Sequence, residues 1–419
     1  MAVKKPRGTN DFYGEKAVML RNVEEKIRKV CRSFRVKEIV TPMFEYTELF
    51  ERGVGETTDI VQKEMFTFED RGGRSLTLKP EGTAGAARAF IENGMSSLPM
   101  PVKLFYIAPC FRNERPQAGR YKQFHQFGVE VYGCEDVRAD AETIALAHNV
   151  IKDLGLKNIK LKINSLGCSE CRKKYNDTLK SFVGERIDSL CEDCKQRFEK
   201  NPLRVLDCKN EKCKEVLAQA PCILDCLDEE CTQHFEALKK HLDNLGIDYI
   251  VDKTIVRGLD YYTRTVFEFV SEDIGAQGTV CGGGRYDNLV KECGGQDTPA
   301  VGFAMGLERI MLLLEQQEST EEEGADVYIA SIGEEGEMYA EKLCGQLRAE
   351  GIAAECDIVG RSLKAQMKYA DKIKAVYSLV IGDDDIKNDS VVLKNMQDGE
   401  KVDIKLSETV NEILNRTRR

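Results

Sequence analysis

The chain has 419 residues, of which 42% are hydrophobic and 32% are charged, and its formal net charge is −10. This length predicts two or three domains, and the composition excludes a disordered chain. No apolar run approaches membrane length, and the N-terminus lacks the apolar core of a signal peptide, so we expect a cytoplasmic protein without a membrane partner. The acidic charge argues only weakly against nucleic-acid binding, because binding depends on where basic residues cluster.

The first third of the chain predicts helices alternating with strands. Apolar residues at helical spacing predict a helix over 17–34, and an extended segment over 36–46 follows, with Pro42 marking an edge or a break. A strand is expected over 75–82, then a short helix over 83–94 that Gly94 ends. Thr83 by itself is best explained as the N-cap of that helix.

Two strand candidates, 102–114 and 123–133, enclose a basic loop and predict an antiparallel hairpin, followed by a helix over 139–154. In the return strand Gln126, Gly128 and Glu130 share one face, since side chains alternate along a strand. Such a face is a poor core face. Taken alone, the segment favours a strand side that faces solvent.

A cysteine-rich insertion is expected over 167–240, because nine of the 16 cysteines fall between Gly167 and Cys231. Two close pairs fit a structural Cys₄ zinc site: Cys191, Cys194, Cys208 and Cys213. Other cysteines offer competing ligands: Cys168, Cys171, Cys222, Cys226 and Cys231. The alternative is that these thiols are reduced and serve as small apolar side chains.

Beyond the insertion, the stretch VRGLDYYTRTVFEFV predicts a strand over 262–270 whose start carries Arg257, Tyr261 and Tyr262. Three successive glycines, Gly282–Gly284, indicate either a bulge or the close approach of a ligand or another backbone. The run 299–317 is expected to form a buried helix, with Arg309 near its apolar face, where an arginine is rare unless it pairs with an anion.

An acidic linker is expected over 318–326, and the segment 326–419 alternates strands and helices as an independent α/β domain. Four basic residues at spacings of three and four predict one face of a helix over 361–374: Arg361, Lys364, Lys368 and Lys372. A solvated basic face is the ordinary explanation, and an RNA contact is the alternative.

Four arginines able to bind anions fall on the expected antiparallel-sheet domain: Arg112, Arg120, Arg257 and Arg309. Arginine forks match phosphate oxygens, so they point to a nucleotide, and neither a Walker loop nor a Rossmann fingerprint is present. FRNE at Arg112, GLERI at Arg309 and the Pro42 segment resemble the three motifs of class II aminoacyl-tRNA synthetases. RGLDYYTRTVFEF and GTVCGGGRYDNLV resemble the signature blocks of the histidyl-tRNA synthetase family, as do KPRGTNDF and KPEGT.

The resemblance implies a multidomain α+β and α/β fold. A class II antiparallel-sheet catalytic domain would occupy 1–322, interrupted by the small helical insertion, with a mixed α/β anticodon-binding domain over 326–419. The implied activity is an ATP-dependent ligase that forms histidyl-adenylate and then charges tRNA(His). The family works as a homodimer with the Pro42 segment at the interface, and we expect the same here.

The resemblance also implies roles for single residues. Arg257 and Arg112 would be catalytic, stabilising the α-phosphate. ATP would be held, with bridging Mg²⁺, by Arg112, Glu114, Arg120 and Arg309. Histidine would be held by Glu81, Thr83, Gln126, Glu130, Arg257, Tyr261, Tyr262 and Gly283. The tRNA would meet the hairpin loop and the C-terminal domain at Gln117, Lys122, Arg361, Lys364 and Lys368.

Two further hypotheses come from other classes. One is the synthetase-like regulatory subunit of ATP phosphoribosyltransferase, which binds histidine without charging tRNA. The arginines together with the 326–419 segment argue against it. The other, a zinc-stabilised RNA-binding protein without catalysis, leaves the cluster of arginines, tyrosines and carboxylates unexplained.

Overall fold

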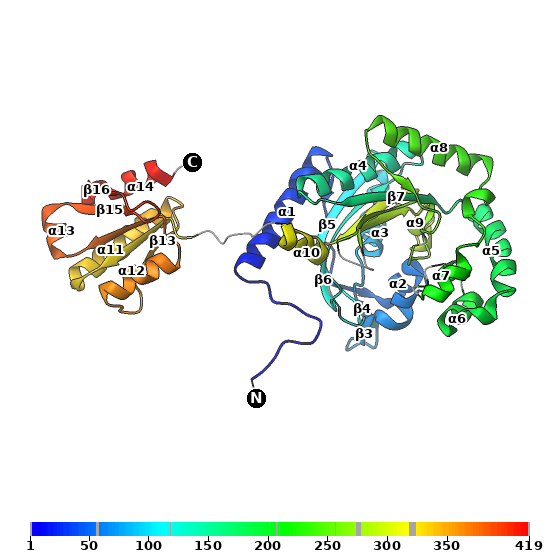
Figure 1. The fold of residues 1–419 in the computed structure, drawn as a ribbon, viewed down its shortest axis with the longest axis horizontal. Coiled ribbons are helices and arrows are strands. Elements are labelled where there is room, and N and C mark those ends of the chain that lie inside the picture. Colours follow the sequence, from blue (N-terminus) through cyan, green and yellow to red (C-terminus); the bar gives the residue numbers. More distant parts are fainter. Residues whose placement is uncertain are drawn as a thin grey trace. The chain divides into compact units, whose positions relative to one another are not determined.

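In the computed structural model, the structure describes residues 2–55, 58–117, 119–200, 202–206, 208, 210–255, 257–273, 278–317 and 324–417. The chain divides into two compact units, Met1–Thr320 and Glu321–Arg419, and each is treated by itself (Figure 1). Residues 318–323 of the expected acidic linker lie outside the described residues. Within the described ranges, no helix is both long enough and apolar enough to cross a bilayer.

The first unit is built on an eight-stranded sheet with the order β1-β5-β6-β11-β10-β9-β7-β8. All neighbours pair antiparallel except at the two edges, where β1 pairs with β5 and β8 with β7 in parallel. The strands are β1 Lys37–Glu38, β5 Val102–Phe111, β6 Gln123–Tyr132, β7 Ile159–Ser165, β8 Ile250–Val251, β9 Thr263–Ser271, β10 Thr279–Arg285 and β11 Ala300–Gly306.

One face of this sheet is closed by four helices: α1 Glu15–Ser33, α4 Val137–Asp153, α8 Glu229–Asn244 and α10 Leu307–Gln317 (Figure 1). Their apolar stripes pack on alternate strand residues, among them Phe127, Val129 and Val131 of β6. Because a strand alternates its side chains, this packing turns Gln126, Gly128 and Glu130 to the other face. That second face carries the polar site.

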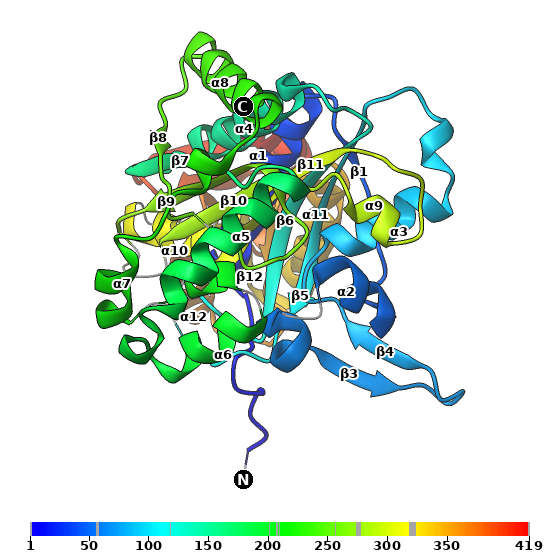
Figure 2. The same cartoon turned by 90° about the vertical axis from the view of Figure 1, so that its right-hand side faces the viewer.

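Smaller elements surround the second face. A three-stranded sheet, in the order β2-β4-β3, forms a projection from the unit (Figure 2). Its strands are β2 Phe44–Tyr46, β3 Phe66–Glu69 and β4 Ser75–Leu78, and the accompanying helices are α2 Thr47–Val54, α3 Thr83–Glu92 and α9 Leu289–Glu292. The expected extended segment at 36–46 is therefore two short strands in two different sheets, with Pro42 between them.

The insertion runs from the end of β7 to β8. It begins with α5 Ser169–Gly184, α6 Glu192–Lys200 and α7 Glu211–Leu217, which lie together in Figure 1, and ends with α8. Its core contains Tyr175, Leu179 and Val183 of α5. Outside the insertion, Asp59 pairs with Arg197 and Arg204 at 3.7 and 3.9 Å, and the carbonyl of Gly258 accepts from Arg204 at 3.1 Å. The insertion is thereby fastened over one side of the polar site.

The second unit is a mixed sheet with the order β13-β12-β14-β15-β16. Its strands are β12 Val327–Ser331, β13 Ala354–Cys356, β14 Tyr377–Ile381, β15 Val391–Asn395 and β16 Lys401–Ile404. Its helices are α11 Gly333–Ala349, α12 Leu363–Lys372, α13 Asp383–Asn388 and α14 Thr409–Thr417, of which the sequence reading missed α13. Val327 and Ile329 belong to the core that contains α11 and α14, whereas Tyr328 and Ala330 contact the α12 side.

One element was predicted wrongly. The run 299–317 was expected to be a single buried helix, but Ala300–Gly306 is β11, and only Leu307–Gln317 is helical. β11 lies between β6 and β10 in the middle of the sheet, with helices packed on one face and the polar site on the other. A short continuous apolar run of this kind does not distinguish a central strand from a buried helix by periodicity, and here the pairing with two neighbours decided it.

Candidate active site

A cavity of about 680 Å³ lies on the second face of the large sheet. Strands β6, β10 and β11 form its floor, and the stretch from Arg257 to Tyr262 forms one wall. The insertion contributes another part of the lining through Cys191, Asp193, Arg197, Arg204, Cys208 and Asn210. Of the predicted histidine and ATP residues, the lining includes Glu81, Thr83, Arg112, Glu114, Arg120, Gln126, Glu130, Arg257, Tyr261, Tyr262 and Arg309.

Gln126 and Glu130 are buried and face this cavity, so the expectation of a solvent-facing strand side was wrong. Tyr106 of β5 explains their placement. Its hydroxyl oxygen lies 3.3 Å from Gln126 Oε1 and 3.2 Å from Glu130 Oε1, and its single hydrogen is shared between these two acceptors. A Cβ on Gly128 would lie 2.2 Å from this ring, so the glycine leaves room for Tyr106 between the two polar side chains.

Three tyrosine rings stand beside Glu130. Tyr261 and Tyr262 have centroids 4.7 Å apart, and Tyr286 contacts both edge-on at 5.4 and 6.3 Å. The Tyr286 hydroxyl donates a short hydrogen bond to Glu130 Oε2. The sequence reading missed Tyr106 and Tyr286. Tyr286 directly follows the triple-glycine strand, and this position could have indicated it. Tyr106 lies opposite Gly128 in the hairpin, and the glycine could have indicated a large neighbour.

Glu130 titrates abnormally. Burial raises the pKa of this carboxyl to about 8, against the lowering effect of the hydrogen bond from Tyr286. A carboxyl with this pKa is mostly protonated at neutral pH. A group with this pKa near the working pH can accept a hydrogen bond from a ring N–H or, when protonated, donate one.

Replacing Glu130 with glutamine is expected to change how stability depends on pH. Because the folded pKa is raised, the folded state binds more protons than the unfolded state between about pH 4.5 and 8. Stability in the wild type therefore falls as pH rises through this window, by at most about 1.4 kcal/mol for each unit of pKa shift. Thermal melts from pH 5 to 9 should show this decline and a flatter curve for E130Q. Parallel curves would contradict the assignment.

Glu81 fixes the start of α3. Its two carboxylate oxygens accept from the backbone N–H groups of Thr83 at 3.0 Å and Ala84 at 2.7 Å. Thr83 is the first helical residue, after Gly82 as N-cap, and its hydroxyl makes no capping bond, so the N-cap expectation was wrong. Burial raises the pKa of Glu81 although these backbone donors lower it. Gln126 Oε1 accepts from the N–H of Gly82 at 2.8 Å and completes this corner.

Arg257 is held at the cavity wall by Glu268, which accepts a short hydrogen bond from Nη1. Its guanidinium lies 5.4 Å from the centroid of the Tyr262 ring. Burial disfavours the charge, but the carboxylate of Glu268 outweighs it and raises the pKa. Nε of Arg257 is buried and has no hydrogen-bond partner among the described residues, which leaves one directed donor for a ligand.

The triple glycine gives Arg257 its room. A Cβ on Gly282 would lie 2.3 Å from Arg257 Nη2, and one on Gly283 would lie 2.3 Å from the carbonyl oxygen of Gly302. Gly284 has φ +157°, and the register with β9 shifts after it. Both expectations for this stretch, a strand irregularity and a close approach, are therefore confirmed. Gly282 belongs to the cavity lining, whereas Gly283 does not.

A second group of arginines faces the cavity from the hairpin and from α10. Arg309 donates to the backbone carbonyls of Gly119, at 3.3 Å, and Thr279. Burial lowers its pKa, and the positive charges of Arg120 and Arg112 lower it further. Arg120 pairs with Glu114 at 3.1 Å, and Arg112 Nε donates to the carbonyl of Pro80 at 2.9 Å. Three guanidinium groups that repel one another indicate a site for an anion.

The hairpin loop carries the other predicted contacts. Gln117 and Arg120 form an isolated β-bridge at its tip. Lys122 Nζ donates to Asn113 Oδ1 at 2.6 Å, and the Lys122 N–H donates to the carbonyl of Gly8 at 2.7 Å. Lys122 is therefore used in part to hold the N-terminal segment against the loop.

In the second unit, Lys364, Lys368 and Lys372 are exposed on one face of α12, and Gln366 and Ala370 are buried on the other. Arg361 does not belong to the helix, which begins at Leu363 after Ser362 as N-cap, so the expected start at 361 was wrong. Its guanidinium pairs with Asp357 at 2.7 Å and lies 4.3 Å from the centroid of the Tyr369 ring. The exposed basic face of α12 therefore consists of the three lysines, without Arg361.

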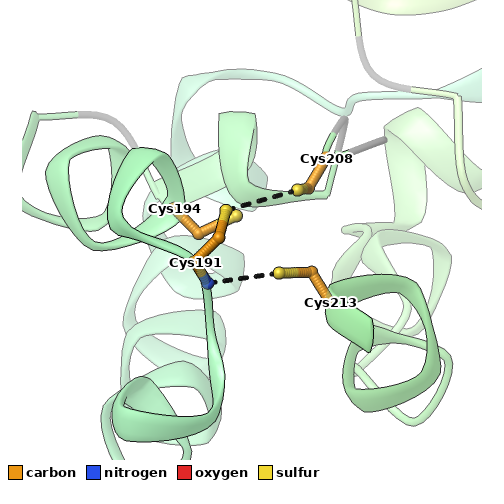
Figure 3. Close-up of side chains that lie close together, drawn as sticks. All are labelled: Cys191, Cys194, Cys208 and Cys213. Atoms are coloured by element: carbon orange, nitrogen blue, oxygen red, sulfur yellow. Dashed lines mark hydrogen bonds between the residues drawn. The ribbon is translucent and has the colours of Figure 1, made fainter. Parts of the chain in front are cut away.

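The four cysteines Cys191, Cys194, Cys208 and Cys213 converge in the insertion (Figure 3). Their sulfur atoms all lie within 4.8 Å of one another. Cys191 Sγ lies 3.8 Å from Cys208 Sγ, and the N–H of Cys191 donates to Cys213 Sγ at 3.3 Å. A tetrahedral site with Zn–S bonds of about 2.3 Å separates its sulfurs by about 3.8 Å. The four thiols have the spacing of a zinc site, and two of them line the cavity.

Comparisons with known proteins agree with this geometry. A family model described as histidyl-tRNA synthetase matches residues 8–310, and one described as an anticodon binding domain matches residues 326–416. The chain is 53% identical to a histidine–tRNA ligase of Acetivibrio thermocellus, covering 99% of this chain and 100% of the relative. It is 54% identical to the histidine–tRNA ligase of Caldanaerobacter subterraneus, with the same coverage.

Solved structures give the same result. The apo histidyl-tRNA synthetase of S. aureus aligns with a TM-score of 0.84 at 39% identity, covering 98% of this chain and 100% of that one. A structure from Bacillus halodurans C, described as an ATP phosphoribosyltransferase regulatory subunit/histidyl-tRNA synthetase, aligns at 0.65 and 24% identity, over 91% of this chain and 98% of that one. That likeness concerns the fold alone. The matches over the whole length identify this chain as a member of the histidyl-tRNA synthetase family.

Proposed function

We propose that this chain ligates histidine to tRNA(His) in two steps, using ATP and a divalent metal ion. The observation that carries the proposal is a single cavity in which buried tyrosines and carboxylates adjoin a group of arginines. The first set suits an imidazole with an amino group, and the second suits a triphosphate. The full-length relatives that share more than half of their residues with this chain support the same activity.

In the proposed first step, a histidine carboxylate oxygen attacks the α-phosphorus of ATP in line. The bond to the β-phosphate breaks, and pyrophosphate leaves with the electron pair. Arg112 and Arg257 stabilise the charge on the α-phosphate, and Arg309 holds the γ-phosphate, while Glu114 and Arg120 contact the nucleotide. Positioning and charge neutralisation supply most of the rate enhancement. Glu64 and Glu114 are carboxylates of the lining that would hold a Mg²⁺ ion, and this hard cation would neutralise charge on the phosphates.

Histidine itself would be read at both ring nitrogens. Glu130 meets one nitrogen and the Tyr262 hydroxyl meets the other, with Tyr261 against the ring and Glu81, Thr83 and Gln126 at the α-amino group. The triple-glycine strand contributes Gly282 to the pocket floor, and Gly283 lies beside it in the strand, outside the lining. An amino acid without the imidazole would leave these buried polar groups unpaired, which rejects it more strongly than shape alone.

In the second step, the terminal ribose hydroxyl of tRNA attacks the histidyl carbonyl carbon, and AMP leaves. The hairpin loop with Gln117 and Lys122 would meet the acceptor end. Arg361, Lys364 and Lys368 of the second unit would contact the anticodon region. We place the protein in the cytoplasm, where tRNA is charged.

Two further assignments belong to this proposal. The Cys191, Cys194, Cys208 and Cys213 cluster would hold a structural zinc ion, since four cysteine sulfurs within 4.8 Å of one another suit Zn²⁺. The working form would be a homodimer. Large apolar side chains are exposed around Pro42, namely Val40, Met43, Phe44, Tyr46 and Phe68, and such a patch is typical of a protein interface.

The test is exchange of labelled pyrophosphate into ATP, followed by charging of tRNA(His). Exchange should require histidine, and a panel of other amino acids should give none. Histidine binding by the folded wild type without exchange would reject the synthetase and favour the regulatory alternative, which the relatives do not support.

Changing Lys364 and Lys368 together to alanine is expected to weaken tRNA charging by about tenfold, with exchange unchanged. Each lost phosphate contact also flattens the salt dependence of binding by about one unit of slope. The matched control changes Lys387 and Lys401 to alanine. Both lysines are exposed in the same unit, so this double variant loses the same charge. Equal losses in both double variants would show that only net charge matters.

A further inference from the structure

A second group of metal ligands lies where the insertion begins and ends. Cys168 and Cys171 flank the first turn of α5, and Asp228 and Cys231 flank the first turn of α8. One ligand atom from each of the four side chains lies within 4.8 Å of all the others. The structure thereby separates the cysteines that competed on spacing alone into two clusters, with Cys222 and Cys226 in neither.

The distances in this group suit a small tetrahedral ion. Cys168 Sγ lies 3.5 Å from Cys171 Sγ, and Asp228 Oδ2 lies 3.1 and 3.2 Å from these two sulfurs. Zinc binds sulfur at about 2.3 Å and carboxylate oxygen at about 2.0–2.2 Å, so its tetrahedral ligands lie roughly 3.6–3.8 Å apart, and the group would open only slightly around the ion. Three soft sulfurs with one oxygen favour Zn²⁺ over Mg²⁺ or Ca²⁺.

The backbone is shaped to bring these atoms together. Gly167 has φ +63°, and a Cβ there would lie 2.4 Å from the Cβ of Cys171. Asp228 uses Oδ1 to cap α8, accepting from the N–H of Cys231 at 2.7 Å, and its Oδ2 remains directed at the sulfurs. The N–H of Asp228 donates to Cys171 Sγ at 3.1 Å, a bond that favours a thiolate.

Burial and charge point the same way. Cys171 and Cys231 are only 2% and 1% exposed, so their sulfurs are largely removed from water. Two helices of 16 residues each, α5 and α8, direct their N-termini at the group, and helix N-termini favour negative charge. A bound cation would replace the protons of the three thiols and balance the charge of the carboxylate.

We propose that Cys168, Cys171, Asp228 and Cys231 bind a second zinc ion, which fastens the two ends of the insertion to each other. The site is also connected to the cavity through the contacts of Arg172. Arg172, next to the ligand Cys171, donates to the backbone carbonyls of Asp260, at 3.3 Å, and Tyr262. The ion therefore positions the helix that supports the tyrosine pair.

The test is the zinc content of the full-length protein, measured by inductively coupled plasma mass spectrometry. The wild type is expected to hold two zinc ions per chain. C168S and C191S should each hold one, and the double variant none. C222S is the matched control, because it removes a cysteine of the same insertion outside both clusters, and it should keep two.

A gentler variant covers the case in which C168S fails to fold. D228N keeps the capping oxygen and loses the carboxylate charge, so one of its two zinc ions should leave to a chelator about 10–100 times faster than in the wild type. If D228N released both zinc ions as slowly as the wild type does, the proposal would be overturned. It would also be overturned if the wild type held a single zinc ion and C191S lost it. The metal count needs no catalytic assay, so its outcome is separate from that of pyrophosphate exchange.

Discussion

Replacing Arg257 with alanine is expected to reduce histidine-dependent pyrophosphate exchange by at least about 10²–10³-fold. Its guanidinium is the partly buried cation beside the tyrosine pair, and removing one preorganised donor to a developing charge costs this much in other enzymes. The variant also removes the arginine partner of Glu268, whose side chain is partly exposed and keeps the hydrogen bond from Thr279 Oγ1 at 3.0 Å. Some loss of stability is therefore expected, smaller than for a fully buried ion pair.

Because stability changes, exchange has to be measured beside thermal melting and with a second variant. R257K keeps a positive charge beside Glu268 but loses the planar guanidinium and its unpaired Nε. It should remain folded and still exchange poorly. R138A is the control, since Arg138 is exposed and pairs with Asp136 outside the cavity lining. Full exchange by folded R257K and R257A would remove the catalytic role assigned to this residue.

Replacing Arg309 with alanine is expected to raise the KM for ATP and lower kcat/KM by about 10²-fold, while the KM for histidine changes little. Arg309 is held by backbone carbonyls and is repelled by Arg112 and Arg120, so it gains most when a phosphate arrives. Removing it also removes this repulsion, so the free protein should not lose stability. R309A should therefore melt at about the wild-type temperature, whereas R257A should melt at a lower one.

Steady-state exchange over a range of ATP concentrations gives the first result, and melting curves with and without ATP give the second. ATP should raise the melting temperature of the wild type more than that of R309A. R309K is the conservative comparison and should recover part of the ATP affinity through its charge. An unchanged KM for ATP in R309A would place the triphosphate elsewhere in the cavity.

Features that depend on neighbouring residues could be predicted from the sequence. Helical spacing gave α1 and α4, alternating residues gave the β5–β6 hairpin, and glycines marked the end of α3 and the close approach at Gly282. The signature blocks pointed to the family before any contact was known, and the comparisons confirmed it. These features depend on residues near one another in the chain, so their physics is contained in a short window.

Side-chain burial in the cavity needed the tertiary structure. Alternation placed Gln126 and Glu130 on one face of β6, but the packing of α1, α4 and α10 on the opposite face made theirs the inner wall of a cavity. Tyr106 and Tyr286 meet Glu130 across 24 and 156 residues of chain. No local pattern encodes a meeting over such separations.

The sequence by itself determined which residue types are available: arginines for phosphates, tyrosines and carboxylates for an imidazole, and cysteines for a metal. Only the tertiary structure decided how they group. Cys171 joins Asp228 across 57 residues, and Cys191 joins Cys213 across 22, although spacing alone allowed other sets. Ligand choice depends on which helix ends converge, and that is set by long-range packing of the insertion rather than by any local preference.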